Sequence, residues 1–254
     1  VENVRAGGFT NFNLDLIFGV ANETLSDWEF DLRSAIDLTP RHISAYSLTI
    51  EPGTEFQRLQ RTGALSLPSD EMQARLFEFT QTLCLLKGYE QYEISNYAQP
   101  GFECQHNLGY WRSLDYLGIG AGAHSFLNVG ETKGKRWSNL PGPKHYIAAV
   151  QASGHAEQRS EEISLENARL EFFLLGLRTT DGVSHAEYAS RFGGEFSEEI
   201  LSVFERYEEY GCVLSEDDTV RLTKKGFLFA DGLLLDIANC LEERTEHFPQ
   251  SPRL

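Results

Sequence analysis

Short apolar segments separated by helix-like stretches constrain the fold of the first hundred residues more than any other feature. Three segments have the pattern of buried strands: residues 12–19, 42–48 and 89–94. Two helix-like stretches lie between them, at residues 24–38 and 70–87. Ser26-x-x-Glu29 fits a capping box for the first helix, and Gly88 ends the second. The order β-α-β-α-β predicts a parallel sheet covered by helices, and therefore an α/β fold.

The second half of the chain has a different pattern. After a loop rich in Gly, Lys and Pro, most segments have helical patterns: residues 143–153, 164–177, 184–191 and 197–209. Two short apolar segments around a polar turn predict a hairpin, at residues 212–214 and 220–222. An apolar helix from Thr223 to about Cys240 follows. We therefore expect an α/β part, a linker, a helical winged-helix-like domain and a loose tail, at residues 1–128, 129–141, 142–241 and 242–254.

The charge of the chain argues against some partners. Lys and Arg number 22 against 38 Asp and Glu, which gives a formal net charge of −16. Such acidity repels nucleic-acid phosphates and anionic membrane surfaces. No apolar run is long enough for a transmembrane helix, and the N-terminal residues match neither a signal peptide nor a presequence. The four scattered cysteines define no disulfide framework, so we expect a cytoplasmic protein, or one in an organelle matrix after import.

Two residues at strand ends are candidates for ligand contact. Asp15 lies in the first strand segment, and ligands gather at the carboxyl ends of parallel strands. Its carboxylate either accepts hydrogen bonds from ribose hydroxyls or an ammonium group, or is a structural Asp satisfied by backbone amides or an arginine. Tyr46 ends the second strand segment, where its ring either stacks on a planar ligand or belongs to the core.

Residues 106–111 (HNLGYW) gather an imidazole, an amide, a phenol and an indole in six positions. Imidazole is a common haem-iron ligand and tyrosine phenolate a rarer one, and Tyr110 shares a face with His106 if the segment is helical. The ring of Trp111 can stack on a flat macrocycle. Cys104, two residues before His106, admits a zinc site, but no further ligands follow at suitable spacing. A structural or simply exposed histidine is the remaining interpretation.

A glycine-rich stretch, residues 118–122 (GIGAG), follows this motif. It does not satisfy GxGxxG, because Ala123 occupies the last position. His124 and Ser125 lie outside any GxSxG nucleophile elbow, which argues against a hydrolase. Small residues at these positions indicate close passage of the backbone against a cofactor or a helix.

These segments together resemble the oxygen-independent coproporphyrinogen III oxidase-like branch of the radical S-adenosylmethionine (SAM) family, and within it the haem-chaperone (HemW-type) members. The resemblance in the α/β part lies in residues 13–19 (NLDLIFG), 42–46 (HISAY), 51–54 (EPGT), 92–97 (YEISNY), 106–111 (HNLGYW) and 120–125 (GAGAHS). In the later part it lies in residues 175–178 (LGLR), 182–183 (GV) and 222–226 (LTKKG). The HNxxYW stretch is the specific part, and it is similar to the chaperone branch rather than to the oxidase proper.

The resemblance implies the C-terminal portion of a partial (β/α) barrel, followed by a helical domain. It implies SAM, a [4Fe-4S] cluster and haem as cofactors or ligands. By the same resemblance, Asp15 binds the SAM ribose, Ile17 lines the same pocket and Tyr46 lies beside the adenosine. His106 is the implied haem contact, with Tyr110 as a weaker candidate.

The family's CxxxCxxC cluster motif does not occur in the 254 residues. Cys84 and Cys104 have the wrong spacing to replace it, so this chain offers no metal ligands for the cluster. We expect the ligands in a segment upstream of Val1, and we expect the chain alone to be inactive in radical chemistry.

The function implied by the resemblance is that of a protein that binds haem and SAM and passes haem to acceptor proteins. The alternative is a coproporphyrinogen III oxidase, in which reductive SAM cleavage gives a 5′-deoxyadenosyl radical that drives oxidative decarboxylation of porphyrinogen propionates. A third hypothesis is a winged-helix-type regulator built on residues 142–240. The net acidity and the lack of a helix rich in Lys and Arg argue against it.

Overall fold

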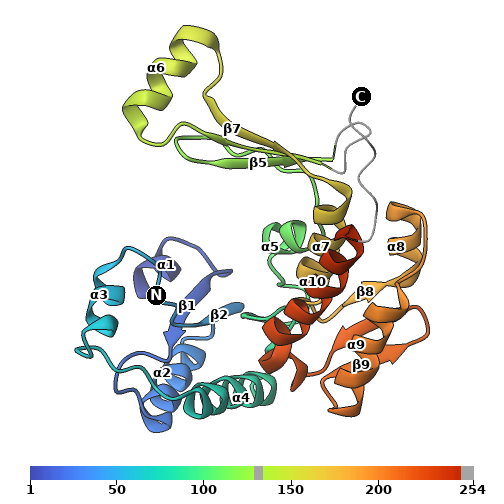
Figure 1. Ribbon diagram of the computed structural model, residues 1–254. Coiled ribbons are helices and arrows are strands. Elements are labelled where there is room, and N and C mark those ends of the chain that lie inside the picture. Colours follow the sequence, from blue (N-terminus) through green and yellow to red (C-terminus); the bar gives the residue numbers. More distant parts are fainter. Residues whose placement is uncertain (129–133, 247–254) are drawn as a thin grey trace, which may run out of the picture. The chain divides into compact units, whose positions relative to one another are not determined.

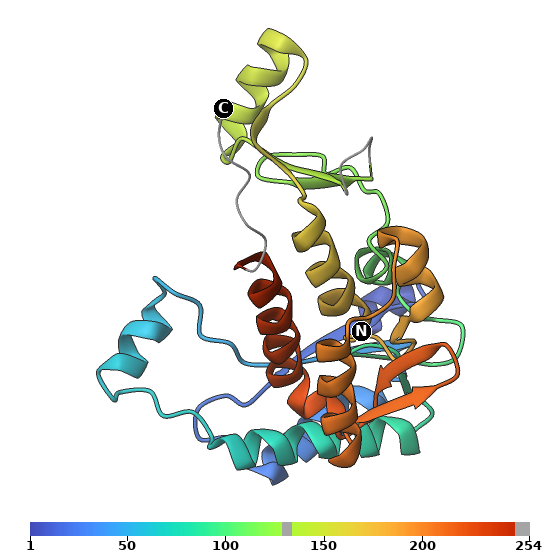
Figure 2. The ribbon, with the colours of Figure 1, turned by 45° about the vertical axis from the view of Figure 1, so that its right-hand side comes forward.

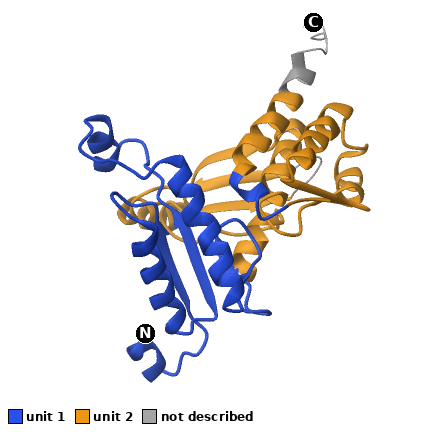
Figure 3. Ribbon diagram, turned by 90° about the horizontal axis from the view of Figure 1, so that it is seen from below, with its two compact units in different colours: residues 1–104, 223–228 blue, residues 105–222, 229–254 orange. Residues whose placement is uncertain are grey.

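The computed structural model describes residues 1–128 and 134–246, with mixed helices and strands (Figure 1). The chain divides into two compact units (Figure 3). Unit 1 comprises residues 1–104 and 223–228, and unit 2 comprises residues 105–222 and 229–254. Each unit has its own sheets and its own hydrophobic core, as the next paragraphs show.

Unit 1 contains a four-stranded sheet with two long helices. Its elements are α1 (Glu2–Ala6), β1 (Asn13–Phe18), α2 (Leu25–Asp37), β2 (His42–Ser47), α3 (Glu55–Arg61), α4 (Asp70–Leu86), β3 (Glu90–Gln91) and β4 (Asn96–Ala98). The strand order is β1-β2-β4-β3, with β1 and β2 parallel. The predicted strands and helices at β1, α2, β2 and α4 are confirmed.

The prediction of an entirely parallel sheet was wrong at the third strand segment. Strand β4 pairs antiparallel with both β2 and β3. The chain reverses direction between β3 and β4, where the Ser95 N–H donates to Glu93 Oε1 at 3.3 Å. Residues 89–94 therefore form a two-residue strand and a turn instead of one strand, and the reversal places residues 96–98 beside β2.

The core of unit 1 lies between one face of the sheet and helices α2 and α4. Trp28 of α2 is 1% exposed, and its indole N–H donates to Thr80 Oγ1 of α4 at 2.8 Å. Phe18 at the end of β1 contacts the Trp28 ring, with 5.3 Å between ring centroids. Leu32 and Ile43 are completely buried in the same cluster. Burial of such side chains contributes about 1.5–3 kcal/mol each, so this cluster fixes the two helices on the sheet.

The N-cap of helix α2 lies two residues before Ser26, the cap predicted from the Ser26–Glu29 box. Thr24 is the N-cap, its side chain accepts from the Asp27 N–H, and the Asp27 carboxylate accepts from the Thr24 N–H. Glu29 instead forms an ion pair with Arg33 one turn later, at 2.7 Å. The Thr24–Asp27 pair and the Ser26–Glu29 pair have the same three-residue spacing, and the structure forms the capping box at the first pair, directly after the loop.

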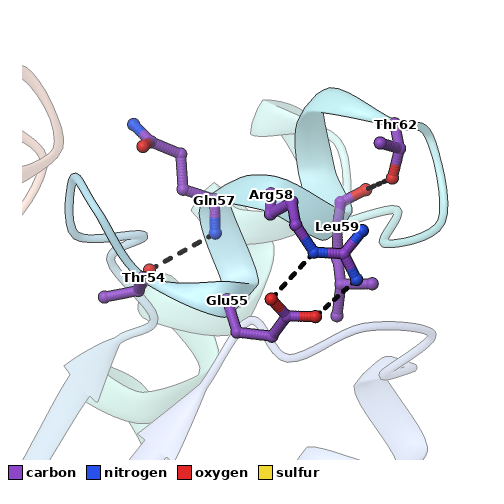
Figure 4. A network of polar contacts seen from close by, with 6 residues as sticks. All are labelled: Thr54, Glu55, Gln57, Arg58, Leu59 and Thr62. Carbon is purple, nitrogen blue, oxygen red and sulfur yellow. Dashed lines mark hydrogen bonds and ion pairs between the residues drawn. The ribbon is translucent and has the colours of Figure 1, made fainter.

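Helix α3 was not predicted, and Figure 4 shows why it forms. Thr54 Oγ1 accepts the Gln57 N–H at 3.3 Å and caps the first turn. The Arg58 guanidinium donates to both carboxylate oxygens of Glu55, at 2.8 and 2.5 Å. The helix has no buried residue, so local capping and pairing stabilise it, and it leaves no apolar period in the sequence.

Unit 2 contains two three-stranded antiparallel sheets and most of the helices. Its elements are α5 (Gln105–Trp111), β5 (His124–Leu127), β6 (Lys135–Asn139), α6 (Pro143–Ser153), β7 (Glu157–Glu162), α7 (Leu165–Gly176), β8 (Val183–Ser184), α8 (His185–Phe192), α9 (Glu198–Glu209), β9 (Val213–Glu216), β10 (Thr219–Leu222) and α10 (Ala230–Glu246). A 3₁₀ turn, η1 (Gly226–Phe229), precedes α10. The sheets have the orders β5-β6-β7 and β8-β10-β9.

The helices and hairpin predicted for the second half are confirmed, whereas the β5-β6-β7 sheet was not predicted. Figure 2 shows the β9–β10 hairpin beside α9. The segment expected as a linker, residues 129–141, contains strand β6, and its residues 129–133 lie outside the described residues. Helix α10 starts after the 3₁₀ turn and extends to Glu246, into the segment expected to be loose; residues 247–254 lie outside the described part of the chain.

An aromatic cluster forms the core of unit 2. Phe173 of α7 is completely buried and its ring contacts four other aromatic rings: Phe172, Tyr188, Phe196 and Phe204. Helix α10 packs against α7 and α9 and buries Leu233 and Ile237. This core holds α7, α8, α9 and α10 together.

Candidate functional site

The parallel register of β1 and β2 brings the three residues predicted for SAM onto one face of the sheet. Asp15 is paired with Ser44, and Ile17 with Tyr46. Residues directly opposite in a sheet project to the same side, so Asp15, Ile17 and Tyr46 share a face. Ile17 is 56% exposed and Tyr46 40%, whereas Phe18, on the opposite face, is 2% exposed. This exposed face is therefore available to a ligand.

A chain of hydrogen bonds runs along this face to Asp15. The Asn13 amide Nδ2 donates to Asp15 Oδ1 at 2.7 Å and to Ser44 Oγ at 3.0 Å. Asn13 Oδ1 lies 2.7 Å from His42 Nδ1, and His42 Nε2 lies 2.7 Å from the Tyr92 hydroxyl. These contacts link two strands and the turn before β4, and they end at the carboxylate predicted to bind SAM.

Burial controls the protonation of the His42 imidazole in this series of hydrogen bonds. His42 is 5% exposed, and its burial lowers the pKa of the imidazole, while the carboxylates of Asp15 and Glu103 act in the opposite direction. Burial is the larger effect, so His42 is neutral at pH 7. A buried neutral imidazole serves here as one donor and one acceptor.

Asn96 completes this face with an unused acceptor. It pairs with Ser44 in the antiparallel register and is 3% exposed. Its buried side-chain oxygen has no hydrogen-bond partner among the described residues. A buried acceptor without a donor is costly, so the face fits a ligand that supplies hydroxyl or amine donors.

The HNLGYW segment lies in helix α5, and a helix is the condition under which His106 and Tyr110 were predicted to share a face. His106 and Tyr110 lie one turn apart, with ring centroids 4.8 Å apart in an edge-to-face contact. Tyr110 in turn contacts Tyr116 at 4.7 Å. His106 is exposed and Tyr110 is 39% exposed. The predicted shared face is confirmed, and the helix presents an imidazole beside a phenol at the surface of unit 2.

Trp111 of the same helix lines a cavity within unit 2. The cavity has a volume of about 300 Å³ and lies among α5, α7, β8 and α8. Leu114, Phe172 and Val183 contribute apolar surface. Arg112, which also lines it, forms an ion pair with Asp181 at 3.1 Å. Trp111 is therefore available to line a cavity, whereas His106 is not among the residues that line this one.

The glycine-rich stretch passes against its own sheet. The Gly118 N–H donates to Ser125 Oγ at 2.9 Å, and the Asn139 amide donates to the carbonyls of Gly118 and Gly120 at 3.2 and 3.0 Å. Ser125 is completely buried and serves as this acceptor. Gly118 allows close packing against strand β5, whereas a Cβ at Gly120 or Gly122 would meet no atom within 4 Å. The predicted close passage is therefore found at Gly118, against a strand, and the contact with a cofactor stays a prediction.

The described side chains form no group of three or more His, Cys, Asp or Glu residues placed to hold a metal ion. Within the same residues, none of the helices is both long enough and apolar enough to span a bilayer.

Asn13, His42, Ser44 and Tyr92 were not predicted as site residues. Asn13 and Asp15 are two positions apart on one strand, which places them on the same face, and that spacing was a usable signal. The contacts to His42 and Tyr92 depend on the register between strands and on the turn before β4, which the residue pattern does not specify.

Comparisons with known proteins identify the class of this fold. Residues 163–229 match the model of the HemN C-terminal domain. The structure of Escherichia coli coproporphyrinogen III oxidase (HemN), described as a radical SAM enzyme, matches with a TM-score of 0.71 and 19% identity, over 94% of this chain and 57% of that one. The chain therefore has the α/β fold of the corresponding part of HemN.

The sequence relatives are more specific. The chain is 36% identical to the haem chaperone HemW of Bacillus subtilis over 230 residues, which are 91% of this chain and 59% of that protein. It is 33% identical to HemW of Escherichia coli, over 89% of this chain and 57% of that protein. The chain spans less than two thirds of the curated relatives it matches. It is a homologue of the HemW-type haem chaperones and carries a HemN C-terminal domain.

Proposed function

We propose that the full-length protein is a haem chaperone of the radical SAM superfamily, which binds haem and SAM and passes haem to acceptor proteins. The observation that carries this proposal is the similarity to HemW proteins over about nine tenths of the chain. The exposed imidazole of the HNLGYW helix supports it, because a surface imidazole is a suitable ligand for haem iron.

The face of β1 and β2 is the proposed SAM site. Asp15 offers a carboxylate to the ribose hydroxyls, Tyr46 offers a half-exposed ring to the adenine, and Ile17 offers apolar surface between them. The unpaired buried oxygen of Asn96 on the same face fits a ligand rich in donors. When bound to a [4Fe-4S] cluster, SAM is the source of a 5′-deoxyadenosyl radical.

The cluster itself does not fit the described residues of this chain. The 254 residues contain no CxxxCxxC motif, and the described side chains form no three-ligand group. The roles proposed for Asp15 and Tyr46 are therefore limited to binding and orienting SAM.

Haem is the proposed cargo, held by His106 with Tyr110 beside it. Haem titration of the full-length protein, followed by the Soret band, should give a saturable shift that is lost or weakened in His106→Ala. His145→Ala is the matched control, because His145 is also an exposed histidine on a helix, α6. An unchanged spectrum and affinity in His106→Ala would remove this ligand from the proposal.

The reaction product distinguishes the oxidase alternative from the proposed chaperone function. The full-length protein with SAM, a reductant and coproporphyrinogen should yield no decarboxylated porphyrinogen if it is a chaperone. Formation of the product at multiple turnovers would replace the chaperone proposal with the oxidase. SAM binding is tested with Asp15→Ala, which should weaken it at least tenfold, against Asp37→Ala, an exposed carboxylate at the end of α2.

A further inference from the structure

The hydrogen-bond chain to Asp15 has a direction that chemistry fixes. An ionised carboxylate only accepts hydrogen bonds, so the Asn13 atom that lies 2.7 Å from Asp15 Oδ1 must be the donor Nδ2. The carbonyl oxygen of Asn13 therefore faces His42 Nδ1, which must carry a proton to donate to it. The neutral ring then has a lone pair on Nε2, which accepts from the Tyr92 hydroxyl.

At its Tyr92 end, the series of hydrogen bonds is fixed by a contact with a backbone N–H group. The Cys104 N–H donates to the Tyr92 hydroxyl oxygen at 3.3 Å, which directs the Tyr92 proton toward His42. Tyr92 is 8% exposed and His42 is 5% exposed, so water does not compete for these bonds. Each member thus has one orientation in which its donors and acceptors match its neighbours.

This series of hydrogen bonds cannot conduct protons, because the Asn13 amide lies between the imidazole and the carboxylate. An amide nitrogen does not take up and release protons in the physiological range, so the chain has a geometric role. Asn13 holds Oδ1 of Asp15, and it is itself held from two sides by Ser44 and His42. The side chain of Asp15, which is exposed, is thereby kept in one rotamer with its other oxygen available.

We propose that Asn13 and His42 are positioning residues that hold the Asp15 carboxylate ready for the hydroxyl groups of a nucleoside ligand. The proposal rests on the proposed SAM site at this face. Its physical basis is preorganisation: a carboxylate already fixed in its bound rotamer loses less side-chain freedom when the ligand binds.

Two substitutions of His42 distinguish positioning from simple packing. In asparagine the side-chain nitrogen is two bonds from Cβ, as Nδ1 is in histidine, so His42→Asn retains the donor to Asn13. In glutamine the side-chain oxygen is three bonds from Cβ, as Nε2 is in histidine, so His42→Gln can still accept from the Tyr92 hydroxyl but loses the donor to Asn13. Both variants remove the ring, and they differ in which hydrogen bond they keep.

The test measures SAM affinity by calorimetry in the full-length protein and its variants. We expect Asn13→Ala and His42→Gln to weaken SAM binding by about fivefold to tenfold, the effect of one lost hydrogen bond, and His42→Asn to stay within about twofold of the wild type. Equal affinities in the two His42 variants would overturn the proposal. Circular dichroism and thermal unfolding check that each variant is folded.

A ligand-free measurement separates this proposal from the proposed function. Nitrogen-15 NMR of His42 should show a protonated Nδ1 and an unprotonated Nε2 at pH 7, and the Asn13 amide signal should move in His42→Gln but not in His42→Asn. If the wild type fails to bind SAM while these signals are as expected, the SAM site is wrong and the chain geometry stands. A protonated Nε2 with a bare Nδ1 would refute the positioning role directly.

Discussion

Two glycines near the HNLGYW motif are expected to respond in opposite ways to alanine. A Cβ added at Gly118 would lie 2.1 Å from the His124 carbonyl oxygen, and 2.7 and 2.9 Å from other backbone atoms of His124. Distances under 3.0 Å essentially never occur for real Cβ atoms, so the backbone at Gly118 would have to move by about 1 Å. A Cβ at Gly109 meets no atom within 4 Å.

The cost of Gly118→Ala follows from the contacts that this movement breaks. The Gly118 N–H bond to Ser125 and the Asn139 bond to the Gly118 carbonyl contribute about 1 kcal/mol each, and the strain that remains adds about 1–3 kcal/mol. We therefore expect Gly118→Ala to lower the free energy of unfolding of unit 2 by about 3–5 kcal/mol. Gly109→Ala should raise it by up to about 1 kcal/mol, because alanine is the better helix former in α5.

Urea denaturation followed by circular dichroism, with hydrogen exchange of the β5 amides to isolate unit 2, measures both changes. The pair is matched, because each substitution adds one methyl group at a glycine near the same motif. A Gly118→Ala protein as stable as the wild type would show that the loop does not pack on β5 as described. A Gly109→Ala protein that is equally destabilised would point to packing on α5 that the structure does not contain.

Three further predictions concern buried and capping groups. Thr80→Val leaves the buried indole N–H of Trp28 without its acceptor and should cost about 1–3 kcal/mol in urea denaturation, whereas Thr80→Ser should cost about 1 kcal/mol; equal losses would contradict the bond. Burial raises the pKa of Cys84 to about 12, so iodoacetamide at pH 8 should label this thiol only after unfolding, and labelling of the native protein would refute its burial. The Ser184 hydroxyl, which donates to Asp218 at 2.5 Å, lowers the pKa of that carboxyl; its contribution is therefore present above the unfolded pKa and is lost as the pH falls through the folded one. Hydrogen exchange at the start of α8 should accelerate below about pH 4 in the wild type, and Asp218→Asn should remove that dependence.

Most of the elements that the sequence predicted correctly have buried apolar faces; helix α6, which has no buried residue, is an exception. Strand β1 ends in buried Phe18, and helix α2 buries Trp28 and Leu32, so the apolar period in the sequence directly reflects the core. The same holds for α7 and α9, whose buried residues form the aromatic core of unit 2. Hydrophobic burial dominates the energetics of these elements, and it is what periodicity detects.

Two elements that the sequence did not predict, β7 and α3, have no buried residue, whereas β4 and β5 were missed although they contain buried residues. Strand β7 is exposed at all six positions, and it forms through backbone pairing with β6. Helix α3 is stabilised by Thr54 and by the pair of Arg58 with Glu55. These residues are polar, so they give the segment no apolar periodicity that would predict a helix. The reversal between β3 and β4 depends on a turn that Glu93 and Ser95 close, within a segment whose composition is that of a strand.

The candidate site shows the same division. Asp15 and Tyr46 were predicted from their places in strand segments, and the parallel register places them on one face, Asp15 in the middle of β1 and Tyr46 near the end of β2. The partners of Asp15 were not, because a hydrogen bond between Asn13 and His42 requires a particular alignment of two strands 29 residues apart in the sequence. Polar contacts between strands are a product of register, and register emerges only when the core and the turns are assembled.

The proposed SAM and haem residues belong to different units of the chain. Whether each ligand binds and whether the two binding events are coupled are therefore separate questions, which a single activity assay does not distinguish. Asp15 belongs to unit 1 and His106 to unit 2, and each unit has its own core. If SAM binding controls haem transfer, the two sites must be coupled, and linkage requires that haem change SAM affinity by the same factor as SAM changes haem affinity. Titration of each ligand in the presence and absence of the other therefore measures the coupling twice. Agreement of the two factors, together with their loss in Asp15→Ala, would assign the coupling to the face of β1 and β2 rather than to a second SAM site.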